Sequence, residues 1–463
     1  AMTARRFHPW LWIALLWLGW VATTDAATPR ERDKIQTWVA ENGLQVILIE
    51  NHVNPMAEVR ILARGGSVHD PDGREGLASL TAWMFNEGGG ELDSSAFQER
   101  LHYYGISMAA DVGSDTIEVH LTSLSEHLDE AFARLGDAML RPRFAQADFE
   151  RALRERSAEL IKSEEDPAFR ASRVLTPRIY GPHPYARPTK GTQESVKRIE
   201  LADIRRHHAA TFRAPGMVMA VAGDITRARL EAQLHTHLEQ LPREPGPFVP
   251  PPKAKPVEKG AETHIEMDQP QTTVRMGVVA IDREDADFYP LTVMNQLLGG
   301  GGLTSRLNQV VREERGLAYG IFSGFSPLAG RGPFTISTET KTESAREAID
   351  LIRAELKRMM DETITEEELR DVQRYLTGSF PLHLDGLDKL AETWCRIGFY
   401  QRGLDYLDTW PERIRAVTRA DVQRVAQRIL NPDRLQTVTV GRTVKAAPVG
   451  DTRPETGASP PSR

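Results

Sequence analysis

IELADIRRHHAATFRAPGMVMAVAGD, residues 199–224, has a counterpart near the other end of the chain, IRAVTRADVQRVAQRILNPDRLQTVTVG at 414–441. Each segment predicts the same order of elements: a helix, a turn marked by proline, and a short apolar strand that ends in glycine. A match between distant parts of a 463-residue chain indicates that one domain is duplicated.

Other paired segments extend the duplication. VRIL at 59–62 matches VRMG at 274–277, and the helical pattern of 128–141 matches that of 345–358. The next helices begin at Gln146 and at Thr365, where Thr365 and Glu368 have the spacing of a capping box. Asn42-Gly43 predicts a tight turn before the strand QVILIE. We therefore expect an α+β fold of two homologous α/β-sandwich repeats, with mostly antiparallel sheets and helices packed on one face.

The composition of the connecting segments sets the domain boundaries. The stretch 242–260 has seven prolines and alternating charge, which favours an extended, semi-rigid linker and permits hinge motion. We assign 2–26 to a signal peptide, 35–241 and 261–443 to the two repeats, and 446–463 to a disordered tail.

The amino-terminal segment has the layout of a secretory signal. Arg5 and Arg6 precede an apolar run at 11–22, and small residues at 24–26 suit cleavage. An uncleaved inner-membrane anchor is the alternative. Export predicts a periplasmic protein, or a secreted one.

Charge and cysteine content narrow the function classes. A net charge of −7 argues against nucleic acid or an anionic membrane as the partner. The single cysteine, Cys395, excludes an internal disulfide and is most simply a buried thiol.

Several segments carry a family resemblance. In the first half they are NGLQVILIE (42–50), PMAEVRILARGGSVHDPDGREGLASLTAWM (55–84) and YGPHPYARPTKGTQESVKRI (180–199). In the second half they are QPQTTVRMGVVA (269–280), DFYPLTVMNQLLGGG (287–301), SRLNQVVREERGLAYGI (305–321) and the final VTVG. The chain resembles the insulinase, pitrilysin and mitochondrial processing peptidase family over residues 35–441.

The resemblance implies an inverted zincin motif, His-x-x-Glu-His on one helix, with a distant third ligand. Here the motif positions hold Ser79, Ala82 and Trp83. A serine hydroxyl is a poor zinc ligand, alanine accepts no proton, and the indole nitrogen is only a donor. Glu159 stands where the family places its third ligand, and we regard it as a relic, most simply a solvated helix residue. We therefore expect no metal and no cofactor in this chain.

No other part of the sequence predicts a replacement site. None of the thirteen histidines stands four residues from another, and the close pairs 207/208 and 235/237 face different sides of a helix. The sequence contains no nucleophile elbow and no phosphate-binding loop.

The second half retains a different feature of the family. Arg312 lies at the end of a predicted helix, Gly316 suits its C-cap, and Tyr319 lies at the start of a strand. Their spacing matches an Arg/Tyr pair that, in this family, reaches toward the zinc site and holds the substrate carbonyl. Read from the residues alone, Arg312 would be a solvated helix residue and Tyr319 a half-buried strand residue.

A glycine run precedes this pair. Gly299, Gly300, Gly301 and Gly302 resemble a shortened form of the Gly-rich loop of the non-catalytic mitochondrial processing subunit, which lets backbone approach a peptide. The alternative is a simple turn at a helix start. Substrate in this family lies as an added strand on a sheet edge.

Three functional hypotheses follow. The first is a non-catalytic, substrate-binding subunit of a heteromeric zinc metallopeptidase, which pairs with a homologous chain that carries the intact motif and the zinc. The second is a structural or peptide-binding protein of the same fold without a peptidase role. The third is a stand-alone hydrolase with an unrecognised site. The sequence does not define the peptide substrate, the partner's identity, the stoichiometry, or whether the halves open and close.

Overall fold

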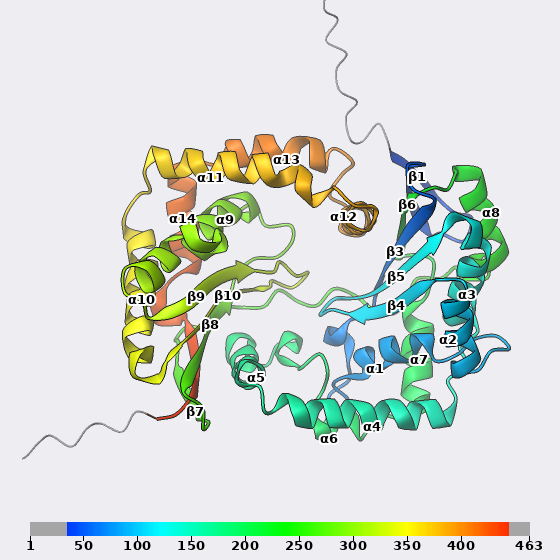
Figure 1. Cartoon of the computed structure of the whole chain (residues 1–463), viewed down its shortest axis with the longest axis horizontal. Coiled ribbons are helices and arrows are strands. Elements are labelled where there is room, and N and C mark those ends of the chain that lie inside the picture. Colours follow the sequence, from blue (N-terminus) through cyan, green and yellow to red (C-terminus); the bar gives the residue numbers. More distant parts are fainter. Residues whose placement is uncertain (1–34, 444–463) are drawn as a thin grey trace, which may run out of the picture.

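The computed structural model describes residues 35–443, which form two halves of similar construction (Figure 1). The predicted signal peptide and the predicted tail lie outside the described residues. Within the described part, no helix is both long enough and apolar enough to cross a membrane.

Each half is built on one sheet. The first half contains β1 Ile35–Val39, β2 Gln45–Glu50, β3 Met56–Arg64, β4 Ser107–Val112, β5 Thr116–Leu124 and β6 Val218–Gly223, in the order β1-β2-β6-β3-β5-β4. Its helices are α1 Leu77–Trp83, α2 Ser94–Tyr103, α3 Leu128–Leu140, α4 Gln146–Ser163, α5 Pro167–Tyr180, α6 Gln193–Val196, α7 Leu201–Thr211 and α8 Arg227–Leu238.

The second half repeats this plan with one strand fewer. Its sheet has the order β7-β11-β8-β10-β9, from β7 Glu262–Glu266, β8 Gln271–Val279, β9 Ala318–Phe325, β10 Pro333–Lys341 and β11 Gln436–Gly441. Its helices are α9 Phe288–Asn295, α10 Ala345–Asp361, α11 Glu366–Ser379, α12 Leu387–Phe399, α13 Tyr406–Arg415 and α14 Arg419–Ile429.

The predicted α+β class with mostly antiparallel sheets is confirmed. Only the pairs β2/β6 and β7/β11 are parallel, and they occupy equivalent places in the two sheets. The matched segments form equivalent elements: β3 with β8, α3 with α10, and α7–β6 with α14–β11. The capping box also forms, because the Glu368 N–H donates to Thr365 Oγ1 (3.1 Å) and the Thr365 N–H donates to Glu368 Oε2 (2.8 Å).

One helix from each half covers the sheet of the other half (Figure 1). Helix α12 packs on β2, β3 and β6, and its Trp394, which is 1% exposed, lies among Ile47, Leu62 and Val218. Helix α5 packs on β8 and β11 in the same way, with Leu175 and Ile179 against Val438. The second face of each sheet is therefore closed by the other repeat, which ties the halves together.

The single cysteine lies at the contact between α12 and the sheet of the first half. Cys395, on α12, donates from Sγ toward the carbonyl oxygens of Val218 (3.3 Å) and Arg60 (3.4 Å) in the first half. Burial raises the pKa of its thiol to about 12, so the reactive thiolate is scarce at pH 8. We expect a thiol reagent such as DTNB to label the native protein negligibly at pH 8, and to label one thiol per chain once guanidinium unfolds it. Rapid labelling of the native chain would contradict the packing of α12.

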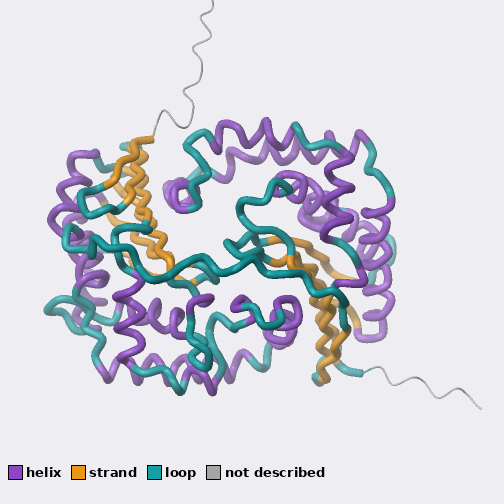
Figure 2. The backbone as a smooth tube through the Cα atoms, turned by 180° about the vertical axis from the view of Figure 1, so that it is seen from behind, coloured by secondary structure: helices purple, strands orange, loops and turns teal. Residues whose placement is uncertain are grey.

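The proline-rich linker is fixed along its length. The His69 ring contacts the Val249 carbonyl through Nε2 (2.9 Å), and the Ala254 N–H donates to the Gly330 carbonyl (2.6 Å). At its far end the Gly260 N–H donates to the Asp433 carbonyl (2.6 Å). Figure 2 shows the loop segments that cross between the halves from behind. These contacts hold the linker against both halves of the chain.

A buried polar network also joins the halves. Tyr185 in the first half donates to Asp115 Oδ1 (2.5 Å), and Tyr185 Oη accepts from the Gly330 N–H of the second half (2.9 Å). Asp115 Oδ2 accepts from the Ala329 N–H (2.9 Å). Burial raises the pKa of Tyr185, so its hydroxyl remains a donor at all ordinary pH values.

Removing this hydroxyl should weaken the chain measurably. Tyr185→Phe leaves one buried carboxylate oxygen without its donor, so we expect a loss of about 1–3 kcal/mol in the free energy of unfolding by urea. Tyr375→Phe, which changes an exposed tyrosine on α11, is the matched control and should stay within about 0.5 kcal/mol of the parent. Equal stability of the Tyr185 and Tyr375 variants would show that the network does not help to hold the halves together.

Candidate functional site

The helix that would carry a zinc motif is α1, and its start is firmly fixed. The Asp70 carboxylate accepts from the N–H groups of Gly76 (2.7 Å) and Ala78 (2.8 Å), and burial raises the Asp70 pKa to about 7. Gly76 has φ +97°, and a Cβ there would lie 2.8 Å from the Lys190 carbonyl oxygen. Glycine is therefore needed where this helix begins against the 190–191 segment.

An arginine occupies the space between the degenerate motif and the relic glutamate. Arg156, on α4 and 4% exposed, donates from Nη1 to Ser79 Oγ (2.8 Å) and lies over the Trp83 ring with 5.0 Å from Cζ to the ring centroid. Its Nε lies 3.2 Å from Glu159 Oε2. Glu159 also pairs with Lys190 through its other oxygen. The Glu159 side chain, which is 33% exposed, is therefore partly solvated and also lies between two cations.

These residues do not fit a zinc ion. Ala82 is buried and offers no ligand, and the only carboxylate of the group is bound to Arg156 and Lys190. Within residues 35–443 no group of three or more His, Cys, Asp or Glu side chains is arranged to hold a metal. A guanidinium cannot lose its proton in a protein, so the cluster carries permanent positive charge where the family holds a metal.

The Arg/Tyr pair lies in the second half, at the edge strand β9. Arg312 belongs to the π-helical turn Asn308–Glu313, Gly316 follows with φ +63°, and Tyr319 is the second residue of β9. The Arg312 guanidinium lies over the Tyr319 ring, 5.2 Å from its centroid. Tyr319 is 90% exposed, because it stands on the outermost strand of the sheet rather than half-buried. The two side chains are thus in contact with each other and accessible from outside.

The glycine run has a packing role that the sequence did not indicate. Gly299 and Gly300 belong to the helical turn Gln296–Gly300 that ends α9, and Gly302 begins the next turn, Gly302–Thr304. Gly299 is buried, and a Cβ there would lie 2.7 Å from the Ser323 backbone nitrogen on β9. The close backbone approach made by Gly299 is therefore to its own sheet. Gly300 is exposed, Gly301 and Gly302 are partly so, and these three remain accessible to a ligand.

The outer edge of β9 is partly closed by a side chain. Asn308 donates from Nδ2 to the Ile321 carbonyl oxygen (2.6 Å), and its Oδ1 accepts from the Ile321 N–H (3.3 Å). The amide thereby takes the place of a neighbouring strand at this position. An added peptide strand could not pair with Ile321 while Asn308 holds it.

The two groups of site residues are not brought together in one chain. Helices α1 and α4 belong to the first half and β9 to the second, and they lie apart in Figure 1. Among residues 35–443 no hydrogen bond or ion pair joins Arg312 or Tyr319 to the Arg156 cluster.

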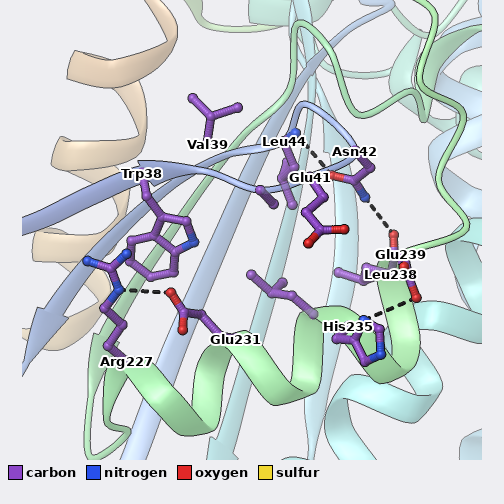
Figure 3. A pocket seen from close by; sticks show the side chains of 12 residues that line it. Trp38, Val39, Glu41, Asn42, Leu44, Arg227, Glu231, His235, Leu238 and Glu239 are labelled. Carbon is purple, nitrogen blue, oxygen red and sulfur yellow. Dashed lines mark hydrogen bonds and ion pairs between the residues drawn. The ribbon is translucent and has the colours of Figure 1, made fainter.

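A hollow of about 450 Å³ between the β1–β2 hairpin and α8 does not offer a site (Figure 3). Its polar groups bond to one another: Arg227 Nε lies 2.8 Å from Glu231 Oε1, and Asn42 Nδ2 donates to the Leu238 carbonyl (2.9 Å). The Arg227 guanidinium also covers the Trp38 ring at 4.6 Å. With these donors and acceptors already paired, we regard the hollow as a packing seam.

Sequence reasoning missed Arg156 and Lys190. Arg156 lies one helical turn before Glu159 and therefore on the same face of α4, which is the only signal the sequence gave. Three other arginines, at 151, 154 and 170, lie nearby in sequence, so burial of this one depends on how α4 meets α1.

The fold defines a peptidase-like chain of two repeats, and comparison with known proteins agrees with that fold. Residues 45–193 match the family model of the insulinase family, peptidase M16, and residues 198–376 match that of the peptidase M16 inactive domain. The chain belongs to the peptidase M16 family.

The curated relatives include a protein named as a non-peptidase homolog and others named as zinc proteases. It is 28% identical over 380 residues to the non-peptidase homolog YmxG of Helicobacter pylori, covering 81% of this chain and 87% of that protein. It is 27% identical over 349 residues to an uncharacterized zinc protease, ML0855, of Mycobacterium leprae, covering 74% of each.

Solved structures agree with the fold. A peptidase M16 inactive domain from Pseudomonas fluorescens superposes with a TM-score of 0.84 at 30% identity, covering 89% of this chain and 99% of that one. A protease from Helicobacter pylori has a TM-score of 0.81 at 19% identity, covering 88% and 99%, and supports the fold alone.

Proposed function

We propose that this chain is the non-catalytic, substrate-binding subunit of a heteromeric zinc metallopeptidase. It supplies half of the chamber and the Arg312/Tyr319 pair to a homologous chain with an intact His-x-x-Glu-His motif, which holds the zinc. The observation that carries the proposal is the contrast between the two halves. The motif helix is closed by a buried arginine, whereas Arg312 and Tyr319 remain paired and open at the edge of the second sheet.

The surface around the pair supports a protein partner. Phe322, on the same strand, is 57% exposed, and Leu303, in the turn packed beside β9, is 59% exposed. These residues and Tyr319 are exposed large apolar side chains on neighbouring elements, and Arg312 lies over Tyr319; aromatic residues and arginine are enriched in protein interfaces. Accessible backbone at 300–302 adjoins this surface and is suited to contact an extended peptide.

The chemistry proposed for the pair is donation to the substrate. The Tyr319 hydroxyl and the Arg312 guanidinium would donate hydrogen bonds to the carbonyl oxygen, which gains negative charge as water attacks the scissile carbon. Such donors are most effective where water is excluded, which closure of two chains around the peptide would provide.

The direct test is reconstitution. The chain is co-expressed with an adjacent homologue that carries His-x-x-Glu-His, and each chain and the mixture are assayed with a library of quenched fluorescent peptides. We expect a stable mixed complex that cleaves peptides in a chelator-sensitive way, and no cleavage by this chain alone. A full-activity partner that neither binds nor responds to this chain would instead support a structural or peptide-binding protein.

Location forms part of the same proposal. The signal-like segment at 2–26 leads us to propose that the chain acts in the periplasm, where peptides to be degraded would reach it. Cell fractionation of the native protein tests this, and recovery of full-length chain in the cytoplasm would contradict it.

A further inference from the structure

A second, unassigned site lies where the two halves and the linker meet. A cavity of about 930 Å³ is bounded by the end of β3, the linker, the loop between β8 and α9, and the turn between α12 and α13. Five basic side chains line it, from both halves: Arg64, Lys253, Arg283, Arg402 and Arg413. Its volume suits a small molecule rather than a macromolecule.

The four arginines have no carboxylate partner within residues 35–443. Each instead lies over an aromatic ring: Arg64 over Phe399 (5.4 Å), Arg283 over Tyr400 (3.8 Å), Arg402 over Tyr406 (5.1 Å) and Arg413 over Tyr289 (5.5 Å). Ring contact holds a guanidinium in place while leaving edge N–H groups for a ligand; one such group, Arg413 Nη1, donates to Tyr289 Oη (3.3 Å). Arg402 also donates to the Arg283 backbone carbonyl, which fixes two of the four side by side.

The acidic side chains at the cavity do not neutralise these arginines. Asp285 is held by Arg428, with 2.6 Å between Oδ2 and Nη2. Asp282, beneath the linker, is held by Lys253 at 2.9 Å. Glu284 is exposed at the rim. The Nε of Arg283 is buried and has no hydrogen-bond partner among the described residues. Unpaired positive charge is thus concentrated in a half-buried space, which is costly without an anion.

We propose that this cavity binds a small anion that carries two or more phosphoryl or carboxylate groups. A single carboxylate or orthophosphate would meet only part of the charge, whereas a diphosphate or a tricarboxylate can accept from several guanidinium groups at once. Because the walls come from both halves, such a ligand would also brace the seam between them.

Isothermal titration of the full chain in 0.15 M NaCl tests the proposal, with pyrophosphate, tripolyphosphate and citrate as probes. Saturable binding of pyrophosphate or tripolyphosphate assigns a phosphoryl ligand, and saturable binding of citrate assigns a carboxylate one. Either should also raise the unfolding temperature beyond the effect of NaCl at equal ionic strength. Absence of saturable binding by all three up to about 5 mM overturns the proposal, since useful small-ligand affinity lies well below that range.

Variants locate the site. Arg413→Gln changes an exposed arginine and should fold normally, and we expect it to weaken binding about tenfold, as loss of a charge-assisted hydrogen bond does. Arg402→Gln should weaken it at least as much. Arg374→Gln, an exposed arginine on α11 outside the cavity, is the matched control and should bind as the parent does. Equal weakening by all three variants would show nonspecific attraction and refute the site.

Discussion

Tyr319→Phe is expected to lower the kcat of the mixed peptidase complex about 100-fold while the complex still assembles. The reason is the loss of one donor to the oxygen that becomes negative in the transition state, an effect of about 2.7–4 kcal/mol where it has been removed from other enzymes. Arg312→Ala should act similarly, and its effect should fall on kcat more than on KM because the hydrogen bond strengthens as charge develops. The measurement is steady-state cleavage of one peptide by purified complexes of equal composition.

Two controls separate this role from a general loss of structure. Tyr375→Phe removes a hydroxyl from another exposed tyrosine, and Arg315→Ala removes a neighbouring exposed arginine that pairs only with Glu347 at 3.6 Å. Both should leave kcat within about twofold of the parent, as surface substitutions away from a site usually do. If Tyr319→Phe and Arg312→Ala turned over as fast as these controls, the pair would have no part in catalysis.

The fold could be predicted from the sequence because the same order of helices and strands occurs in both halves of the chain. Helix and strand patterns at 199–224 and 414–441 agree in order and spacing, and local signals such as the Thr365/Glu368 capping box fixed individual helix starts. The sequence pattern does not indicate which surface the apolar face of each helix packs against. Nothing in the local sequence around Trp394 indicates that this residue packs on the sheet of the first half.

The site was only partly predictable for a related reason. The spacing of Arg312 and Tyr319 placed them on a helix end and a strand start, but exposure of Tyr319 follows from the position of β9 at the sheet edge. Strand order is a long-range property. Likewise, the sequence showed which zinc ligands are missing. It did not show that the Arg156 guanidinium takes their place, because that contact depends on the packing of α4 against α1.

Arg156 leads to the second large expected effect, on metal binding. Restoring the motif by Ser79→His, Ala82→Glu and Trp83→His should not by itself create a zinc site, whereas adding Arg156→Ala should. Arg156 already holds Glu159, the remaining ligand, at 3.2 Å. A guanidinium about 4 Å from a divalent ion would oppose binding by roughly 8 kcal/mol at an effective dielectric constant of 20. Removal of that charge frees both the space and the carboxylate.

Metal analysis after dialysis against buffered zinc distinguishes the two variants. We expect about one zinc per chain in the fourfold variant, which includes Arg156→Ala, and a negligible amount in the threefold variant, which keeps Arg156. Three protein ligands are the usual minimum for a catalytic zinc, and Arg156 holds the third one, Glu159. Arg154→Ala, added to the threefold variant in place of Arg156→Ala, is the matched control: it removes an arginine from the same helix without touching the cluster, and should not restore binding. Stoichiometric zinc in the threefold variant would show that Arg156 does not prevent metal binding at this position.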